Sequence, residues 1–254
     1  NRIMGELKNA YALIIGVGND LPITVRDATA IYNLLAEPTL GGYPKENITI
    51  LTEETATRDG ILGALDGLIN QATEEASVLL FYSGHGGTYT THDLLELSNQ
   101  PTVPEEENRD FFFLQPSNFE VKDFNNTWVK AEELREKIGR IKSKRLILLL
   151  DCCHAAGMTH NLSFDSNFTP QKELQHAEGL AQNIDNGNGM SIISSCREDQ
   201  KSWILDGDYN SLFTKCLLEV LRGEHKKYLE EPFIRISETI QYIFKKVPEL
   251  KPVQ

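Results

Sequence analysis

Two short stretches decide the fold of this chain: VLLFYSGHGG at residues 78–87 and RLILLLDCCH at residues 145–154. Each is a run of apolar residues that passes directly into a polar cluster. Uninterrupted apolar runs of this length predict strands that are buried on both faces, as in a parallel sheet. The carboxyl ends of neighbouring parallel strands meet at one edge of the sheet, so we expect the two polar clusters to share one crevice.

The rest of the chain alternates between strand and helix patterns. Further strands are predicted at residues 10–17, 48–52, 111–114 and 190–195. Helices are predicted at residues 26–35, 57–76, 129–141, 211–221 and 236–247, with Ser211 as a cap and Gly223 after a helix end. This alternation predicts an α/β fold with a mostly parallel central sheet and helices on both faces.

Composition excludes several classes of protein. The 254 residues carry 25 Lys and Arg against 37 Asp and Glu, a net charge of -12, which excludes a generally basic nucleic-acid binder. No apolar run approaches the ~20 residues that span a bilayer, and no secretion signal opens the chain. The four cysteines form no CxxC pair. We therefore expect a reducing, cytoplasmic location, with no nucleic-acid or membrane partner.

The chain is expected to form a single domain over residues 1–254, interrupted by one long loop. Residues 155–189 lack clear periodicity and end in turn-forming residues, so we predict an exposed loop there that is open to cleavage. The chain starts at Asn1 without Met and stops at Gln254 in polar sequence. From this we expect a fragment or a processed chain.

The two polar clusters contain a histidine and cysteines whose chemistry is complementary. His85 and Cys153 are 153 minus 85, or 68, positions apart, and adjacent strands would bring them within hydrogen-bonding range as a thiol and its base. The backbone N–H groups of Gly86 and Cys153 are candidate oxyanion donors. The competing interpretation is an ordinary loop histidine beside small buried cysteines.

Neighbouring residues on a strand point to opposite faces, so Cys152 and Cys153 cannot both enter the crevice. We interpret Cys196 and Cys216 as core residues, and His154 as a neighbour that lines the site. A nucleotide-binding interpretation of Gly16-Val17-Gly18 is weak, because the third glycine of GxGxxG is missing.

Four motifs together resemble those of a known family: ALIIGV at 12–17, FYSGHGG at 81–87, LLLDCCHAAG at 148–157 and IISSCREDQ at 192–200. Their sequences and their order along the chain are similar to those of the metacaspases and bacterial caspase-like peptidases of the caspase clan. The resemblance implies a caspase-haemoglobinase fold with His85 as base and Cys153 as nucleophile. It also implies a large-subunit-like part (1–154), an intersubunit-type loop (155–189) and a small-subunit-like part (190–254) that is truncated at its C-terminus.

The same resemblance bears on specificity. Metacaspases place acidic residues at the base of the S1 pocket and cleave after Arg or Lys, and the matching residues here are Asp27, Ser83 and Asp151. Burying a pair of carboxylates costs free energy unless a cation binds between them. A guanidinium suits this place because it forms bidentate hydrogen bonds with carboxylates. The competing role for Asp27, which matches the Asp that opens the family's first helix, is a helix cap or a partner of the helix dipole.

Two departures from the family pattern concern the nucleophile loop and metal binding. The family's usual CHSGG is CHAAG here, through Ala155 and Ala156, and His160 stands about where a calcium-binding Asp is expected. The acidic residues Asp93, Asp110 and 105–107 could bind a cation, but charge runs usually form solvated faces. We therefore predict no cofactor and no tightly bound metal.

The sequence thus predicts a cysteine endopeptidase that hydrolyses peptide bonds after Arg or Lys through a thioester acyl-enzyme. Its expected partners are protein or peptide substrates with a basic P1 residue, and a regulatory domain or activator outside this chain. Regulation, self-processing and a role in cell death or defence are extrapolated from the family. The alternative function is an inactive caspase-like scaffold that binds a partner peptide.

Overall fold

The computed structural model of this chain describes residues 7–152, 181–182, 190–195, 207–225, 234 and 236–250. A six-stranded sheet forms its centre, in the order β2 (Ile48–Thr52), β1 (Ala10–Gly16), β3 (Ser77–Ser83), β7 (Arg145–Asp151), β9 (Met190–Ser194) and β8 (Ala181–Gln182). The first five strands pair in parallel, and β8 pairs antiparallel with β9. The predicted α/β fold with a mostly parallel sheet is confirmed.

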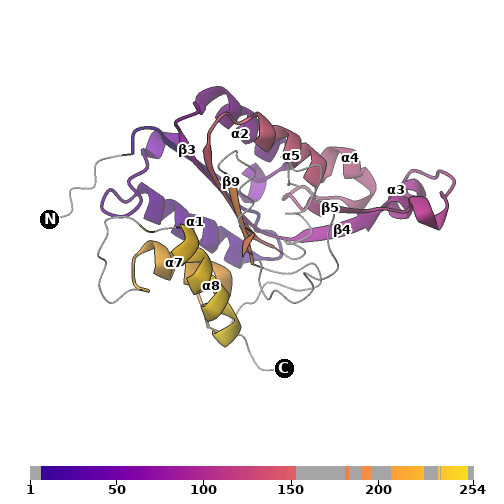
Figure 1. The fold of residues 1–254 in the computed structure, drawn as a ribbon. Helices are drawn as coiled ribbons and strands as arrows, with labels where there is room; N and C mark the ends of the chain where they lie inside the picture. The colour runs from indigo at the N-terminus through magenta and orange to yellow at the C-terminus, as the bar shows by residue number, and fades with distance from the viewer. Residues whose placement is uncertain are drawn as a thin grey trace.

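Helices cover both faces of this sheet (Figure 1). One face packs against α1 (Pro22–Ala36), α7 (Leu212–Leu221) and α8 (Ile236–Leu250), and the other against α2 (Arg58–Gln71) and α5 (Ala131–Arg140). The remaining helical segments are short: α3 (Thr91–Leu97), α4 (Phe124–Thr127), η1 (Lys45–Asn47), η2 (Glu53–Thr55), η3 (Glu105–Glu107) and η4 (Val121–Asp123).

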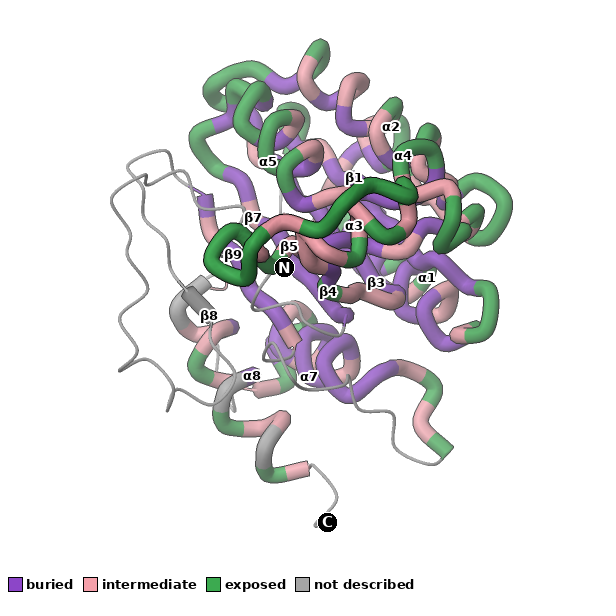
Figure 2. Tube along the Cα trace, turned by 90° about the vertical axis from the view of Figure 1, so that its right-hand side faces the viewer, coloured by how far each residue is buried: buried purple, intermediate pink, exposed green. Residues whose placement is uncertain are grey.

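Burial on both faces explains why the strand sequences are apolar without interruption. On β7, Leu148 and Leu150 pack with α2 and α5, whereas Leu149 between them packs with α1 and α7. A polar residue at any of these positions would enter one of the two cores. Figure 2 shows the result: buried segments run through the middle of the molecule, and exposed segments lie on its outer turns.

Several helix boundaries differ from those predicted. Helix α1 begins at Pro22, four residues before the predicted start, because proline is tolerated in the first helical turn, where its missing N–H would have no partner anyway. Helix α2 ends at Gln71 rather than 76, and α8 continues to Leu250 rather than 247. The cap at Ser211 is confirmed, since its side chain accepts a bond from the Thr214 N–H.

A second, antiparallel sheet projects from the body of the molecule beside the central sheet (Figure 1). It contains β4 (Gly86–Thr90), β5 (Asp110–Leu114) and β6 (Val129–Lys130). The extra strand predicted at 111–114 is therefore present but outside the central sheet, and β4 was not predicted. Val129 was wrongly assigned to the helix that begins at Ala131. Stacking of Phe113 on Trp128, with ring centroids 4.1 Å apart, holds this sheet together.

Most of the predicted loop at 155–189 lies outside the described residues, as do the predicted site residues Cys153 and His154. Within the loop range, residues 181–182 form β8, which the sequence did not predict. Among the helices of the described ranges, none combines the length and the apolar character needed to cross a membrane.

Candidate active site

Three central strands end level with one another and define the edge at which the site lies. Gly16, Ser83 and Asp151 are register partners across β1, β3 and β7. A side chain at position 16 would place its Cβ 2.3 Å from the Thr24 carbonyl oxygen, so only glycine allows α1 to pack this close to the strand end. The polar residues that follow β3 and end β7 therefore share one edge, as expected.

The predicted S1 residues Asp27, Ser83 and Asp151 come together at this edge. The Ser83 hydroxyl donates to Asp27 Oδ2 at 3.1 Å. Asp27 Oδ1 accepts from Asn210 Nδ2 at 2.9 Å and from the Ser211 N–H at 3.1 Å. Asp27 is 0% exposed, so its carboxylate is enclosed entirely by protein groups.

Asp151 faces the same segment of chain. Its Oδ2 accepts from the Ser211 hydroxyl and from Thr214 Oγ1, the latter at 3.4 Å. Ser211 therefore contacts both carboxylates, with its backbone N–H on Asp27 and its hydroxyl on Asp151. The start of α7 is thus bonded to the second turn of α1 and to the end of β7. We call the set Asp27, Ser83, Asp151, Asn210 and Ser211 the carboxylate cluster.

Burial and charge act together on Asp27. Desolvation, followed by the neighbouring charge of Asp151, raises the pKa of Asp27 to about 6, and the bonds from Asn210, Ser211 and Ser83 partly oppose this rise. The ionised pair is therefore held at a cost in free energy. A cation placed between the two carboxylates would remove much of that cost.

The alternative role of Asp27 as a helix cap is wrong. Helix α1 starts at Pro22 with Leu21 at its cap position, so Asp27 lies in the second turn with its side chain directed into the cluster. The sequence reasoning also missed Asn210, Ser211 and Thr214 as partners of the carboxylates. Ser211 was identified, but only as a cap, and nothing in the local sequence shows that its hydroxyl also reaches Asp151.

His85 follows β3 in a loop whose backbone is fixed by several hydrogen bonds. The His85 carbonyl accepts from the Tyr82 hydroxyl at 2.7 Å and from the Gln115 N–H at 3.0 Å. Burial, with a smaller contribution from Cys152, raises the pKa of Tyr82, so the phenol remains protonated and able to donate. The ring Nε2 lies 3.1 and 3.0 Å from the two carboxylate oxygens of Asp20, a partner that the sequence reasoning did not identify.

Two of the four cysteines, Cys152 and Cys216, lie within the described residues, and both are buried. Cys152 is 1% exposed and packs in the core between the sheet and α2 and α5. Cys216 is buried on the opposite side of the sheet, which confirms its assignment to the core. Cys153 and Cys196 lie outside the described residues. Gly86 begins β4 opposite Leu114, and its role as an oxyanion donor stays a prediction.

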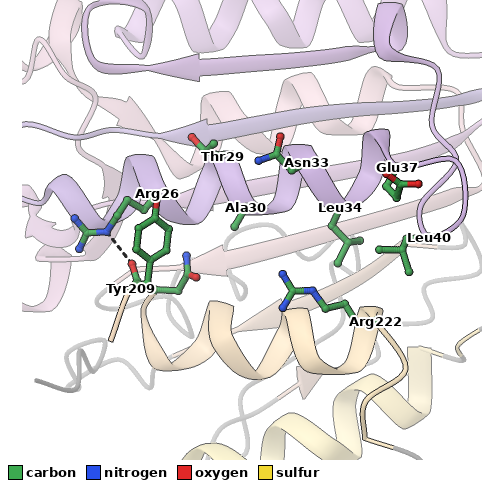
Figure 3. A pocket seen from close by; sticks show the side chains of 10 residues that line it. Arg26, Thr29, Ala30, Asn33, Leu34, Glu37, Leu40, Tyr209 and Arg222 are labelled. Carbon is green, nitrogen blue, oxygen red and sulfur yellow. Dashed lines mark hydrogen bonds between the residues drawn. The ribbon is translucent and has the colours of Figure 1, made fainter. Parts of the chain in front are cut away.

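A cavity of about 360 Å³ adjoins the carboxylate cluster between α1 and the residues at the two ends of α7 (Figure 3). Arg26 forms one of its walls, donates through Nε to the Tyr209 carbonyl at 2.7 Å, and has its guanidinium carbon 5.3 Å from the centre of the Tyr209 ring. Arg26 and Tyr209 are the chain neighbours of Asp27 and Asn210. The contact therefore holds residues 209–211 against α1 next to the buried hydrogen bonds.

Two of the acidic residues considered as cation ligands, Asp93 and Glu105, make local contacts. Asp93 caps α3 through bonds from the Thr90 N–H and hydroxyl at 2.6 and 2.8 Å, and Glu105 lies 3.8 Å from His92 Nδ1. Across the described ranges, no three His, Cys, Asp or Glu side chains gather in a way that could hold a metal ion.

Comparison with known proteins places this arrangement in context. The family model of the caspase domain (Peptidase_C14) matches residues 9–253. Metacaspase-1 of Saccharomyces cerevisiae is 30% identical over 159 residues, which cover 57% of this chain and 33% of that protein. Metacaspase-1 of Eremothecium gossypii is 30% identical over 160 residues, covering 58% and 32%. The chain thus spans about one third of the curated relatives that it matches.

A solved structure shows the same fold. The crystal structure of protein GSU0716 from Geobacter sulfurreducens matches with a TM-score of 0.57 and 19% identity, over 96% of this chain and 90% of that one. At this identity the likeness concerns the fold alone.

Proposed function

The chain belongs to the caspase domain family, and on that premise we propose that it is a cysteine endopeptidase that cleaves peptide bonds after Arg or Lys. The observation that carries the specificity is the buried pair Asp27 and Asp151, on the strand edge from which the His85 loop leaves. Two carboxylates in a desolvated site favour a cationic side chain and repel an acidic one.

The proposed reaction passes through a thioester. The Cys153 sulfur attacks the scissile carbonyl as His85 accepts the thiol proton, and the backbone N–H groups of Gly86 and Cys153 stabilise the oxyanion. His85 then donates the proton to the leaving amine, and water hydrolyses the thioester with His85 again as base. Cys152 is unsuited to this role because it is buried in the core on the side of α2 and α5.

Substrate binding would rearrange the carboxylate cluster. Asp27 now accepts bonds from Asn210 and Ser211, and a P1 guanidinium would replace one or more of these neutral donors. Charge-assisted bonds are stronger than bonds from neutral donors, so the exchange is favourable for Arg or Lys. It is unfavourable for Asp, whose side chain brings a third negative charge.

We also propose, from the family and the composition, that the enzyme acts in the cytoplasm without cofactor or metal, as one domain with an intersubunit-type loop at 155–189. Cleavage in that loop, control by a segment or activator outside residues 1–254, and a role in cell death or defence belong to the same proposal. Incubating the chain with Cys153→Ala protein as substrate, with and without a chelator, tests self-processing and metal dependence together.

The central test is cleavage of a peptide library by the wild type, Cys153→Ala and Cys152→Ala, read by mass spectrometry. We expect cuts after Arg and Lys by the wild type, none by Cys153→Ala and substantial activity in the matched control Cys152→Ala. Loss of cleavage in both folded variants would contradict the assignment of the nucleophile. Peptide binding without cleavage by the wild type would instead favour the inactive scaffold.

A further inference from the structure

The loop after β1 holds Asp20 in a tight turn. Gly18 and Asn19 both have positive φ, 78° and 56°, a conformation that glycine and asparagine adopt at low cost. The Leu21 N–H donates to the Gly18 carbonyl at 3.0 Å and closes the turn. The Gly18 N–H donates to Thr24 Oγ1 at 2.8 Å, which ties the turn to the first turn of α1.

A second contact fixes the side of this turn that faces the His85 loop. Asn19 Nδ2 donates to the Ser117 carbonyl at 3.0 Å, two residues after Gln115, whose N–H binds the His85 carbonyl. The turn that carries Asp20 and the loop that carries His85 are thus attached to the same segment of chain. Asp20 is held in place by its backbone even though its side chain is 73% exposed.

His85 is anchored in the same manner. Its carbonyl accepts hydrogen bonds from the Tyr82 hydroxyl and the Gln115 N–H. A Cβ at Gly84 would lie 2.7 Å from that hydroxyl, so the close approach of Tyr82 requires glycine there. With the backbone fixed, the orientation of the imidazole depends only on the side-chain torsion angles of His85. Asp20 is the side chain that contacts the ring nitrogen Nε2, with both oxygens at about equal distance.

We propose that Asp20 is a positioning residue that orients His85 and selects its reactive tautomer, an inference that rests on the cysteine peptidase function proposed above. An ionised carboxylate only accepts hydrogen bonds, so Nε2 carries the hydrogen in the neutral ring. This leaves the lone pair on Nδ1. The thiol proton of Cys153 therefore goes to Nδ1, and the same nitrogen later returns a proton to the leaving amine.

Asp20 also stabilises the charged intermediate state of the reaction. When Nδ1 takes the thiol proton, the imidazole becomes a cation and its Nε2–H bond to Asp20 becomes a bond between full charges. The bond is thus stronger after proton transfer than before it. An interaction that strengthens towards the transition state raises kcat rather than substrate affinity.

The proposal is tested by Asp20→Asn and Asp20→Ala, with Glu54→Gln as the matched control. Glu54→Gln removes the same charge from an exposed residue of η2, just after β2. We expect kcat to fall about tenfold in Asp20→Asn and further in Asp20→Ala, with KM changed less than about twofold, because the bond to Asp20 strengthens only as His85 becomes charged. The control should retain wild-type kcat. Unchanged kcat in both Asp20 variants, or a change confined to KM, would overturn the proposal.

A spectroscopic measurement decides the matter independently of cleavage. Two-bond ¹H–¹⁵N spectra report which imidazole nitrogen carries the hydrogen, and His85→Gln assigns the signal. We expect the Nε2–H form of His85 in the wild type and a mixture of the two forms in Asp20→Ala. Identical tautomer populations would refute the role of Asp20. An inactive wild type that shows the expected tautomer change would refute the peptidase function and leave the positioning role supported.

Discussion

The carboxylate cluster and the His85 loop lie at the same edge of the sheet, yet they use aspartate in opposite ways. Asp27 is fully buried, accepts three hydrogen bonds and has a raised pKa, whereas the Asp20 side chain is 73% exposed and contacts one histidine. A buried charge interacts strongly with any cation that enters, because little water screens it. An exposed charge serves mainly to orient its partner. Under the proposed function, the first region would select the substrate and the second would align the histidine.

The largest effect is expected from Asp27→Asn on substrate choice. The substitution keeps the shape of the side chain but removes one charge from a desolvated pair, and breaking such an interaction costs about 2 to 5 kcal/mol, or tens to thousands of fold in kcat/KM. The loss should fall on peptides with Arg or Lys at P1, with Gln much less affected. Measured kcat/KM for peptides that differ only at P1 tests this, and alkylation of the nucleophile by a small neutral reagent is the control. Undiminished preference for Arg would remove Asp27 from the pocket.

The pH dependence of stability should differ between the two regions. Asp27 has a pKa of about 6 in the folded chain, above that of an exposed carboxyl, so the folded state binds the proton more tightly than the unfolded state does. The free energy of unfolding should therefore fall as pH rises from about 4 to about 6, by up to about 3 kcal/mol, and stay low above that range. Urea unfolding of the wild type and Asp27→Asn at several pH values measures the effect. A wild-type curve with the same slope as that of Asp27→Asn would show that Asp27 is ionised without penalty.

A smaller loss of stability is expected from Ser211→Ala. The Ser211 hydroxyl donates to Asp151 and accepts from the Thr214 N–H at 3.1 Å, so its removal takes one hydrogen bond from a buried carboxylate and the side-chain cap from the start of α7. Together these cost about 1 to 3 kcal/mol. Chemical denaturation should detect this, and Ser98→Ala at the end of α3 provides a comparison at a solvent-exposed helix terminus. Equal stability of the two variants would argue against Ser211 as the link between α7 and the carboxylates.

The smallest effect on stability is expected from Asp20→Asn. Exposed ion pairs contribute at most about 1 kcal/mol, so the midpoint of urea unfolding should hardly move while catalysis declines. At Asp27, by contrast, we expect the charge to affect both stability and selectivity. A loss of stability as large as that of Ser211→Ala would show that the turn at Gly18–Leu21 depends on Asp20 for its structure.

The sequence predicted the central sheet well because its strands are buried on both faces. An apolar run such as RLILLL is stable in few places other than a buried strand, and β7 extends from Arg145 to Asp151, one residue beyond the predicted end at Leu150. The small sheet was harder to predict. The segment GGTYT of β4 begins with two glycines and is polar, and it forms a strand only because β5 pairs beside it and Phe113 packs against Gly87. Its tertiary partners therefore override its weak local preference.

The place of Asp27 at the site was implied only by the family resemblance. The pattern of the sequence was enough to predict the class of fold, the chemical groups and the edge of the sheet where Ser83, His85 and Asp151 lie. These follow from local pattern, since an apolar run fixes a strand and the residue after its end is fixed with it. Only the tertiary structure decided which groups satisfy the carboxylates and the histidine. Asn210 and Ser211 are more than 180 positions from Asp27, and Asp20 is 65 from His85, so no local pattern can pair them. The carboxylates find their partners when α7 packs beside α1, because buried polar groups must take their hydrogen bonds from whatever segment is adjacent. Asp20 meets His85 because the loops after β1 and β3 lie side by side at the same edge of the sheet.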